Sequence, residues 1–425
     1  MSWTPLLTKD AAEPVWKTIG EIADALREAA AGEGLRERDG GPSARLSDGD
    51  AGISLFFAYL AEASGDEGAA ELADFYLERA LAALQRGALA PGLFDGFTGV
   101  AWVAEHLQGM IFERDDENLN QPVDDALLGL LQTPAGLGGY DLINGLAGLG
   151  IYALETLPRS SGHECLELVT RRLLEISEAA GPGRRWLTPP ERLPPRQLAQ
   201  CPAGHFNLGV AHGVPGVIGL LGAARQLGAA SPAMRDLLAE AVAWLLTQSR
   251  GDGAEWHFSN WDAPGAPAER SRLAWCYGDP GIAATLLLAG RAASEPAWER
   301  KALDIARTAA VRSPSTSEVR DASLCHGAAG LGHLFHRLYR TTGDELLAEA
   351  ARSWFERTLL LRRPGEGLGG YLFDERTGEA EPWTSNPGFL NGIAGVGLCL
   401  LAAVSPLEPA WDRTLLLSAP PRRDV

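Results

Sequence analysis

The 425-residue sequence has few cysteines, no excess of basic residues and no long apolar run. Five cysteines are an odd, sparse set in so long a chain, which argues against a disulfide framework and favours a reducing compartment. Acidic residues outnumber basic ones by 55 to 37, and the net charge of −18 argues against binding to nucleic acid or anionic lipid. No stretch approaches the about 20 apolar residues of a membrane helix, and the first residues lack the pattern of a secretion signal. We therefore expect a cytoplasmic protein.

Glycine, by contrast, is abundant, with 50 residues. A Gly-x-x-Gly step opens an apolar helical run seven times, and its first glycines are Gly49, Gly96, Gly145, Gly213, Gly278, Gly327 and Gly392. The intervals run from 47 to 68 residues. This spacing indicates a helical-pair repeat of about 45 to 50 residues, with insertions of about 15 to 20 residues in three of the units.

Two kinds of helix alternate along the repeat. The glycine-led helices are apolar almost all round, as in residues 53–60 and 282–289, which is typical of buried inner helices. The helices between them carry one apolar stripe, formed by Val15, Ile19, Ile22 and Leu26, by Leu77, Leu81 and Leu84, by Met234, Leu238, Ala241 and Leu245, or by Leu347 and Trp354.

Seven inner helices that are apolar all round cannot face water, and a closed ring buries them where an open array would need polar caps. We therefore predict an all-α fold, a seven-fold α/α toroid of inner and outer helices, as a single domain over residues 1–425. The inner helices of such a ring all run the same way, so the seven glycine turns gather at one end. That end is the predicted site.

Three stretches interrupt the helical pattern, at about residues 181–207, 251–270 and 368–386. They are rich in proline or aromatic residues, are not helical in composition, and the third reads as a hairpin with a polar turn at residues 374–378. Each leads into a glycine motif, so we expect short β and loop insertions over the active-site end, as walls of a groove. Loops that merely plug the ring are the alternative.

Soft metal ligands stand directly before two of the glycine turns. Cys276 precedes Gly278, and Cys325 and His326 precede Gly327. Two thiolates and an imidazole are three ligands of a tetrahedral zinc site, and three protein ligands leave the fourth position for a substrate. An isolated cysteine is more often a small buried hydrophobe, and that reading stays open for each of them. It is preferred for the two helical cysteines, Cys165 and Cys399.

The glycine motifs also carry a resemblance. The series Tyr140-Asp141-Leu142-Ile143-Asn144-Gly145, Ala211-His212-Gly213-Val214-Pro215-Gly216, Trp275-Cys276-Tyr277-Gly278 and Cys325-His326-Gly327 resembles the lanthionine synthetase C family, the LanC cyclases. The resemblance covers nearly the whole chain, with the motifs in the family's order. It implies an α/α toroid with one catalytic zinc ion per chain, for which Cys276, Cys325 and His326 fall on the ligand positions.

The implied reaction adds a peptide cysteine thiol to dehydroalanine or dehydrobutyrine and forms lanthionine or methyllanthionine rings. The implied substrate is a dehydrated lanthipeptide precursor peptide. A dehydratase and an exporter are candidate partners in a membrane-bound biosynthetic complex, with which the cytoplasmic cyclase would associate peripherally.

Three residues, His212, Asp141 and Arg272, match active-site positions of the family, and Tyr277 is a further catalytic candidate. His212, with a side chain that titrates near neutral pH, suits protonation of the enolate that thiol addition creates. Asp141 orients or charges His212, or takes the thiol proton; a helix N-cap is the alternative. Arg272 is expected to stabilise the enolate oxygen, and a structural ion pair is the alternative. Tyr277 is expected to donate a hydrogen bond to the enolate oxygen or to the coordination sphere of the zinc.

Weaker candidates and other functions remain. His205 and Cys201 could approach the groove, whereas His333 and His336, in a surface or semi-buried run, read as structural. A LanC-like zinc- or glutathione-binding protein without cyclase activity stays open, although retention of Asp141, His212 and Arg272 argues against it. A zinc-dependent thiol alkyltransferase would need a basic diphosphate-binding patch, which the motifs lack.

Overall fold

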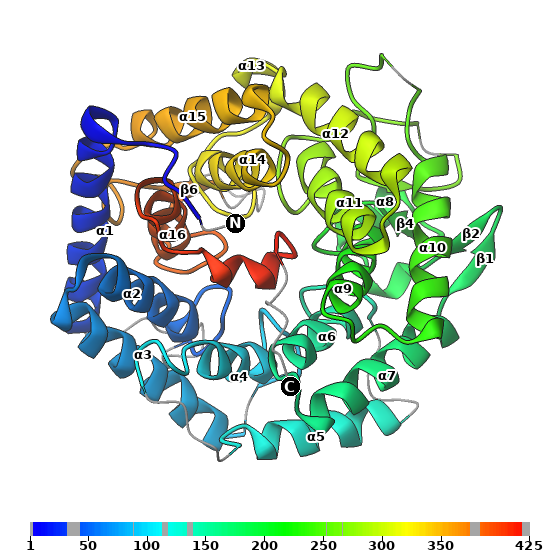
Figure 1. The fold of residues 1–425 in the computed structure, drawn as a ribbon, viewed down its shortest axis with the longest axis horizontal. Coiled ribbons are helices and arrows are strands. Elements are labelled where there is room, and N and C mark those ends of the chain that lie inside the picture. The colour runs from blue at the N-terminus through cyan, green and yellow to red at the C-terminus, as the bar shows by residue number, and fades with distance from the viewer. Residues whose placement is uncertain are drawn as a thin grey trace. The chain divides into compact units, whose positions relative to one another are not determined.

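The computed structural model describes residues 3–31, 43–87, 89–112, 118–133, 139–251, 253–265, 267–374 and 383–418. The chain divides into two compact units. Unit 1 comprises Met1–Asn120 and Val319–Trp411, and unit 2 comprises Gln121–Glu318 and Asp412–Val425. Both units are built from pairs of helices (Figure 1).

Unit 1 pairs four glycine-led helices with amphipathic partners. The glycine-led helices are α2 (Asp50–Ser64), α4 (Phe97–His106), α14 (Ala328–Thr342) and α16 (Ile393–Val404). Their partners are α1 (Glu13–Ala31), α3 (Glu67–Gln85) and α15 (Glu345–Leu360), preceded by the short η1 (Lys9–Ala11). Helix α3 packs on α2, α15 packs on α14, and α1 packs on α16. Every residue of α16 is buried, as expected of an inner helix.

Unit 2 repeats the arrangement with three glycine-led helices. These are α6 (Leu146–Glu155), α9 (Val214–Gln226) and α11 (Asp279–Ala293). The other helices are α5 (Gln121–Gln132), α7 (Ser160–Glu175), α10 (Pro232–Thr247), α12 (Pro296–Ala310) and α13 (Pro314–Ser317), while η3 (Ala410–Leu415) lies at the unit boundary. Helix α9 packs against both α6 and α11, and α7, α10 and α12 cover these three from outside (Figure 1).

The predicted glycine starts are confirmed. All seven first glycines are the N-caps of the glycine-led helices, namely Gly49, Gly96, Gly145, Gly213, Gly278, Gly327 and Gly392. The second glycine of the step is required by close approach. A Cβ would come within 2.5 Å of the carbonyl oxygen six residues earlier at Gly52, Gly99, Gly216, Gly281, Gly330 and Gly395. These six helices therefore start in direct backbone contact with the turn that precedes each of them.

Backbone hydrogen bonds join neighbouring turns within each unit. In unit 1 they run from Cys325 N–H to Leu390 O (2.9 Å), from Leu390 N–H to Ser47 O (2.8 Å) and from Ser47 N–H to Phe94 O (3.0 Å). In unit 2 they run from Leu142 N–H to Ala211 O (3.0 Å) and from Ala211 N–H to Cys276 O (3.3 Å). Motifs that are 47 to 69 residues apart in sequence, or 343 residues apart for Ser47 and Leu390, are thus held side by side.

The insertions contain the strands. The strands are β1 (Glu178–Ala180), β2 (Gly183–Arg185), β3 (Leu187–Thr188), β4 (His205–Asn207), β5 (Trp261–Asp262), β6 (Phe373–Asp374) and β7 (Trp383–Thr384). β1 pairs with β2, β3-β4-β5 form one antiparallel sheet, and β6 pairs with β7. The hairpin prediction is confirmed, but Asp374 lies in β6 rather than in the turn, and residues 375–378 lie outside the described residues. The first insertion also holds two short helices, η2 (Pro190–Arg192) and α8 (Pro195–Gln200), although its proline-rich composition predicted no helix. They form because each has a proline in its first turn, where a helix tolerates proline.

The outer stripes are buried largely as predicted. Val15, Ile19, Ile22 and Leu26 of α1 are at most 1% exposed, and the α10 stripe is equally buried. Leu81 and Leu84 of α3 are only half-buried, because alanines and Tyr76 provide much of the contact face of that helix. Within the described residues, no helix combines the length and apolarity that crossing a membrane requires.

His333 and His336 are fully buried, so the prediction of a surface or semi-buried run was wrong. The His336 ring lies 4.3 Å from Trp3 and the His333 ring lies 4.6 Å from Trp411, measured between centroids. Both tryptophans are remote in sequence from α14, so the i, i+3 spacing of the histidines could not predict that tryptophan rings cover them. Burial, then the charges of His333 and Arg337, lower the pKa of His336 to about 2.

Acid should therefore destabilise the protein through His336. The unfolded chain takes up a proton below the ordinary histidine pKa of about 6.5, whereas the folded chain does not, so stability present above that pH is lost as the pH falls. From pH 7 to pH 5 this histidine should remove about 2 kcal/mol of unfolding free energy. Urea unfolding at both pH values should show that His336→Leu loses less stability than the wild type, while the exposed-site control His163→Leu behaves like the wild type. An equal loss in His336→Leu would contradict this assignment.

Candidate active site

Asp141 and His212 face each other in unit 2. His212 Nδ1 lies 3.7 Å from Asp141 Oδ1, and the His212 side chain is 47% exposed. Asp141 Oδ1 also accepts the backbone N–H groups of Ile143 (2.9 Å) and Asn144 (3.0 Å). Burial raises the pKa of Asp141, but the hydrogen bond and charge of His212 and the two backbone donors outweigh it and hold that pKa below its ordinary value. The pair therefore joins an anionic carboxylate to a solvent-accessible imidazole.

Asp141 is not the N-cap of α6, because that position belongs to Gly145. Its bonds to Ile143 and Asn144 instead close the turn before the helix. Three other turns are closed by a residue six positions before their first glycine: Asn207 to Gly209 N–H, Asp321 to Ser323 N–H and Asn386 to Gly388 N–H. Asp141 stands four positions before Gly145, so its carboxylate is out of register with the residues that close the other turns.

The turn of Cys276 and Tyr277 packs directly on the turn that carries His212. The carbonyl of Cys276 accepts the Ala211 N–H, and the His212 and Tyr277 rings are 6.2 Å apart between centroids. Tyr277 Oη accepts a hydrogen bond from Asn207 Nδ2 (3.0 Å). Gly278 follows with φ of 108°, a left-handed conformation that favours glycine, whereas the other six N-cap glycines are extended.

Arg272 contacts the sulfur of Cys276. Its Nη2 lies 3.5 Å from Cys276 Sγ, and the cysteine is 4% exposed. A guanidinium beside a sulfur favours the thiolate, which is the form that binds metal. This contact gives Arg272 a role at the sulfur that sequence reasoning did not foresee.

In unit 1, His326 is held by Asp321. Asp321 Oδ2 lies 3.6 Å from His326 Nε2, and Asp321 is almost fully buried. The same carboxylate accepts the N–H and hydroxyl of Ser323 and the N–H of Asp374. A carboxylate at one ring nitrogen orients the imidazole and leaves the other nitrogen for a metal. Cys325, the preceding residue, is half-buried.

A pocket of about 380 Å³ in unit 2 opens on the Asp141–His212 pair. One wall comes from the motif turns and the other from the first insertion, and the lining is Gly139, Tyr140, Asp141, Leu187, Thr188, Pro189, Arg192, Leu193, Pro194, Gln197, His205, Asn207, His212 and Tyr277. A hydrogen bond between Tyr140 Oη and Thr188 Oγ1 (3.1 Å) ties the two walls together. The first insertion is thus a groove wall, as predicted.

His205 reaches this pocket, and Cys201 does not line it. His205 is fully buried, its ring stacks on Trp261 at 5.1 Å, and its Nε2 lies 3.4 Å from Gln197 Oε1. Burial lowers the pKa of His205 to about 4, so the ring is neutral near pH 7. Cys201 packs instead beneath the wall, in a cluster with Leu193.

Comparison with known proteins identifies the family of this chain. Residues 43–416 match the family described as "Lanthionine synthetase C-like protein". The chain belongs to the lanthionine synthetase C-like family. It is 26% identical over 402 residues to the "Nisin biosynthesis protein NisC" of Lactococcus lactis subsp. lactis, covering 88% of each chain. It also matches the solved structure named "Nisin cyclase" with a TM-score of 0.71 and 21% identity, over 95% of this chain and 96% of that one. This likeness confirms the predicted fold class, an α/α toroid.

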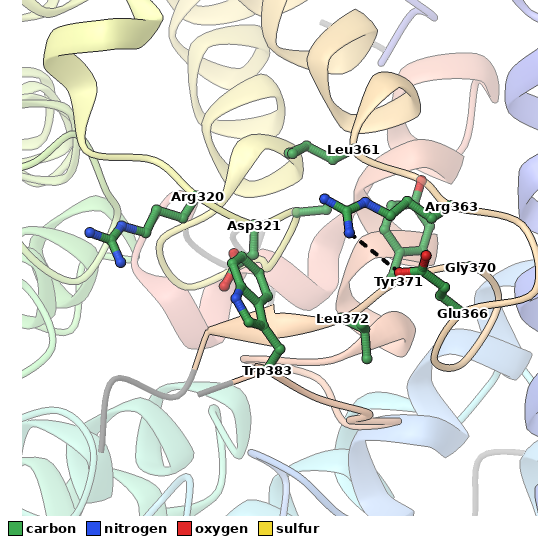
Figure 2. A pocket seen from close by; sticks show the side chains of 10 residues that line it. Arg320, Asp321, Leu361, Arg363, Glu366, Gly370, Tyr371, Leu372 and Trp383 are labelled. Atoms are coloured by element: carbon green, nitrogen blue, oxygen red, sulfur yellow. Dashed lines mark hydrogen bonds and ion pairs between the residues drawn. The ribbon is translucent and has the colours of Figure 1, made fainter. Parts of the chain in front are cut away.

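In this member of the lanthionine synthetase C-like family, a second pocket lies beside Asp321 in unit 1 (Figure 2). It measures about 220 Å³ and is lined by Arg320, Asp321, Ala322, Leu361, Arg363, Glu366, Gly370, Tyr371, Leu372 and Trp383. Arg320 pairs with Asp374 and Arg363 pairs with Glu366, each at 3.4 Å. The third insertion thus shapes the surface next to the turn of Cys325 and His326.

Sequence reasoning missed Asp321, although a signal was present. Asp321 stands six residues before Gly327, as Asn207 and Asn386 stand six residues before their own glycines. The shared offset would have marked it as a turn-closing residue. Its further contact with His326 depends on the curvature of the turn, which spacing alone does not encode.

Proposed function

We propose that this protein is a zinc-dependent lanthipeptide cyclase, which adds cysteine thiols of a dehydrated precursor peptide to dehydroalanine or dehydrobutyrine to form thioether rings. The observation that carries the proposal is the convergence of Asp141, His212, Tyr277 and Arg272 on the turn of Cys276, in a member of the lanthionine synthetase C-like family. This set combines an acid–base pair with a cysteine whose sulfur is polarised by a guanidinium.

Cys276, Cys325 and His326 are the proposed zinc ligands. Each offers one ligand atom, a sulfur or an imidazole nitrogen. The donor set fits zinc, since Arg272 favours the thiolate of Cys276 and Asp321 fixes the His326 ring. When bound at three protein ligands, zinc lowers the pKa of an incoming peptide thiol, and the two thiolate ligands keep that sulfur nucleophilic.

The proton of the reaction passes through the Asp141–His212 pair. The peptide sulfur forms a bond to the β-carbon of the dehydro residue, and the π electrons of the alkene move onto the amide carbonyl to give an enolate. His212 then donates a proton to the α-carbon, and the proton released by the thiol restores it. Asp141, held anionic by its donors, orients the imidazole and balances its charge.

The test offers a chemically dehydrated precursor peptide to the purified protein. Cyclisation consumes one free thiol per ring without any change in peptide mass, because the reaction is an addition within one molecule. A protein that binds zinc and glutathione but leaves the thiols free would be the non-catalytic relative. A peptide that gains mass at a thiol, with a prenyl diphosphate supplied, would identify an alkyltransferase.

Asp321→Asn should weaken zinc binding. The amide keeps an oxygen for the Ser323 N–H but loses the charge that orients His326, and loss of such a partner typically costs about 10- to 100-fold in metal affinity. Competition with a chromogenic chelator measures the change. Asp344→Asn, which alters the N-cap of α15 in the same unit, is the control and should retain wild-type zinc affinity.

A further inference from the structure

Arg192 lies on the pocket wall that faces the Asp141–His212 pair. It ends η2 of the first insertion, is exposed, and is the one arginine or lysine among the described residues that line this pocket. It forms no ion pair within the described part of the chain. A guanidinium in this position is available to a ligand that enters between the two walls.

Gly139 lets Arg192 and Asp141 approach each other at the pocket wall. A Cβ on Gly139 would lie only 2.8 Å from Asp141 Oδ2 and 3.3 Å from Arg192 Nη1, so a side chain there would crowd both groups. The position six residues before the first glycine holds Asn207, Asp321 or Asn386 in three other turns. Here it holds glycine, and the turn is closed by Asp141 instead. The Arg192 guanidinium therefore lies close to the Asp141 carboxylate, and both groups line the pocket together with Gly139.

The insertion holds the Arg192 backbone in place. The Arg192 N–H donates to Pro189 O (3.0 Å), and the next residue, Leu193, is buried with Cys201 and Ala263. Thr188, in the adjoining strand, bonds to Tyr140 beside Asp141. The guanidinium thus projects from a short, packed element toward Gly139 and Asp141, and only the Arg192 side chain has to be ordered on binding.

The two arginines of the site have different contacts. Arg272 lies against the sulfur of Cys276, whereas Arg192 lines the pocket beside Asp141 and His212. His205, the other basic group on the insertion wall, is neutral near pH 7. Arg192 is therefore the cation best placed for negative charge that develops on a peptide in this pocket.

We propose that Arg192 is a catalytic residue that binds the carbonyl oxygen of the dehydro residue, a role that rests on the proposed cyclase function. As the thiolate forms its bond to the β-carbon, the alkene π electrons move onto that oxygen, and the Arg192 N–H groups stabilise the enolate. When the enolate reverts to the amide, the α-carbon takes the proton from His212. The pocket lined by Arg192, Asp141 and His212 receives the carbonyl, and Arg272 acts on the thiolate.

Arg192→Gln tests this assignment. It should lower kcat for cyclisation by about 100-fold with little change in KM, because a donor that strengthens in the transition state is lost. Arg192→Lys should restore part of the rate. Arg196→Gln, which removes the same charge from α8 at an exposed position that does not line the pocket, should match the wild type. Gly139→Ala, which crowds Asp141 and Arg192, should lower kcat and retain zinc.

The outcomes separate the two proposals. If the wild type cyclises the peptide and Arg192→Gln keeps its kcat, or loses only peptide affinity, Arg192 is not the enolate donor, and the cyclase function stands. If the wild type leaves all peptide thiols free although zinc is bound, the cyclase function fails, and the role of Arg192 fails with it. Circular dichroism and zinc content of each variant show that a loss of rate is not a loss of folding.

Discussion

Cys276→Ala is expected to abolish ring formation and zinc binding while the helices persist. The substitution removes one of the three proposed zinc ligands together with the sulfur that Arg272 contacts. Loss of the metal forfeits several kcal/mol of transition-state stabilisation, which corresponds to a rate loss on the order of 1,000-fold or more. The fold should remain, because the Cys276 carbonyl that accepts the Ala211 N–H belongs to the backbone and α11 starts at Asp279.

Metal analysis beside thiol titration checks this expectation. All five cysteines are free thiols, so each alanine variant should lose one titratable thiol after denaturation. Cys165→Ala is the matched control, since it makes the same change at a buried position of α7 and should retain zinc and activity. A metal-free Cys276→Ala protein with full activity would refute the zinc role. Loss of helicity on chelation of the wild type would instead make the metal structural.

The helix starts were accessible from the sequence for a physical reason. A glycine-led helix can start against its own preceding turn only if both glycines lack a Cβ, so the constraint is local, and it recurs at six of the seven helix starts. The apolar stripes are equally local, because burial of one helix face requires the 3.6-residue period. A resemblance in the motif order then indicated Cys276, Cys325, His326, Asp141 and His212 together.

The parts that escaped prediction depend on contacts between remote segments. Arg192 reaches the pocket only because Thr188 bonds to Tyr140 and Leu193 is buried, and neither contact follows from periodicity. His336 was misjudged because Trp3, more than 300 residues away in sequence, covers it. That the two compact units act as one domain stays a prediction, as does the involvement of a dehydratase and an exporter.

His212→Asn should retain zinc and bind the peptide but lose cyclisation by about 100- to 10,000-fold, the contribution typical of a positioned acid or base. Asparagine can still hydrogen-bond to Asp141 but cannot carry a proton to the α-carbon. His163→Asn, at an exposed position of α7, is the control and should keep the wild-type rate.

A labelling measurement tells proton transfer from a merely structural role. In D₂O, each ring closure should place one non-exchangeable deuterium at the α-carbon, so the product returned to H₂O is heavier by about 1 Da per ring. Because His212 is proposed to deliver the proton, the cyclisation rate should differ between D₂O and H₂O. This solvent isotope effect should vanish or change in His212→Asn, where water becomes the proton donor. Unchanged turnover in that variant would reassign His212 to structure. A parallel loss in Asp141→Asn, with zinc retained, is expected because Asp141 Oδ1 lies 3.7 Å from His212 Nδ1 and its proposed role is to orient that ring.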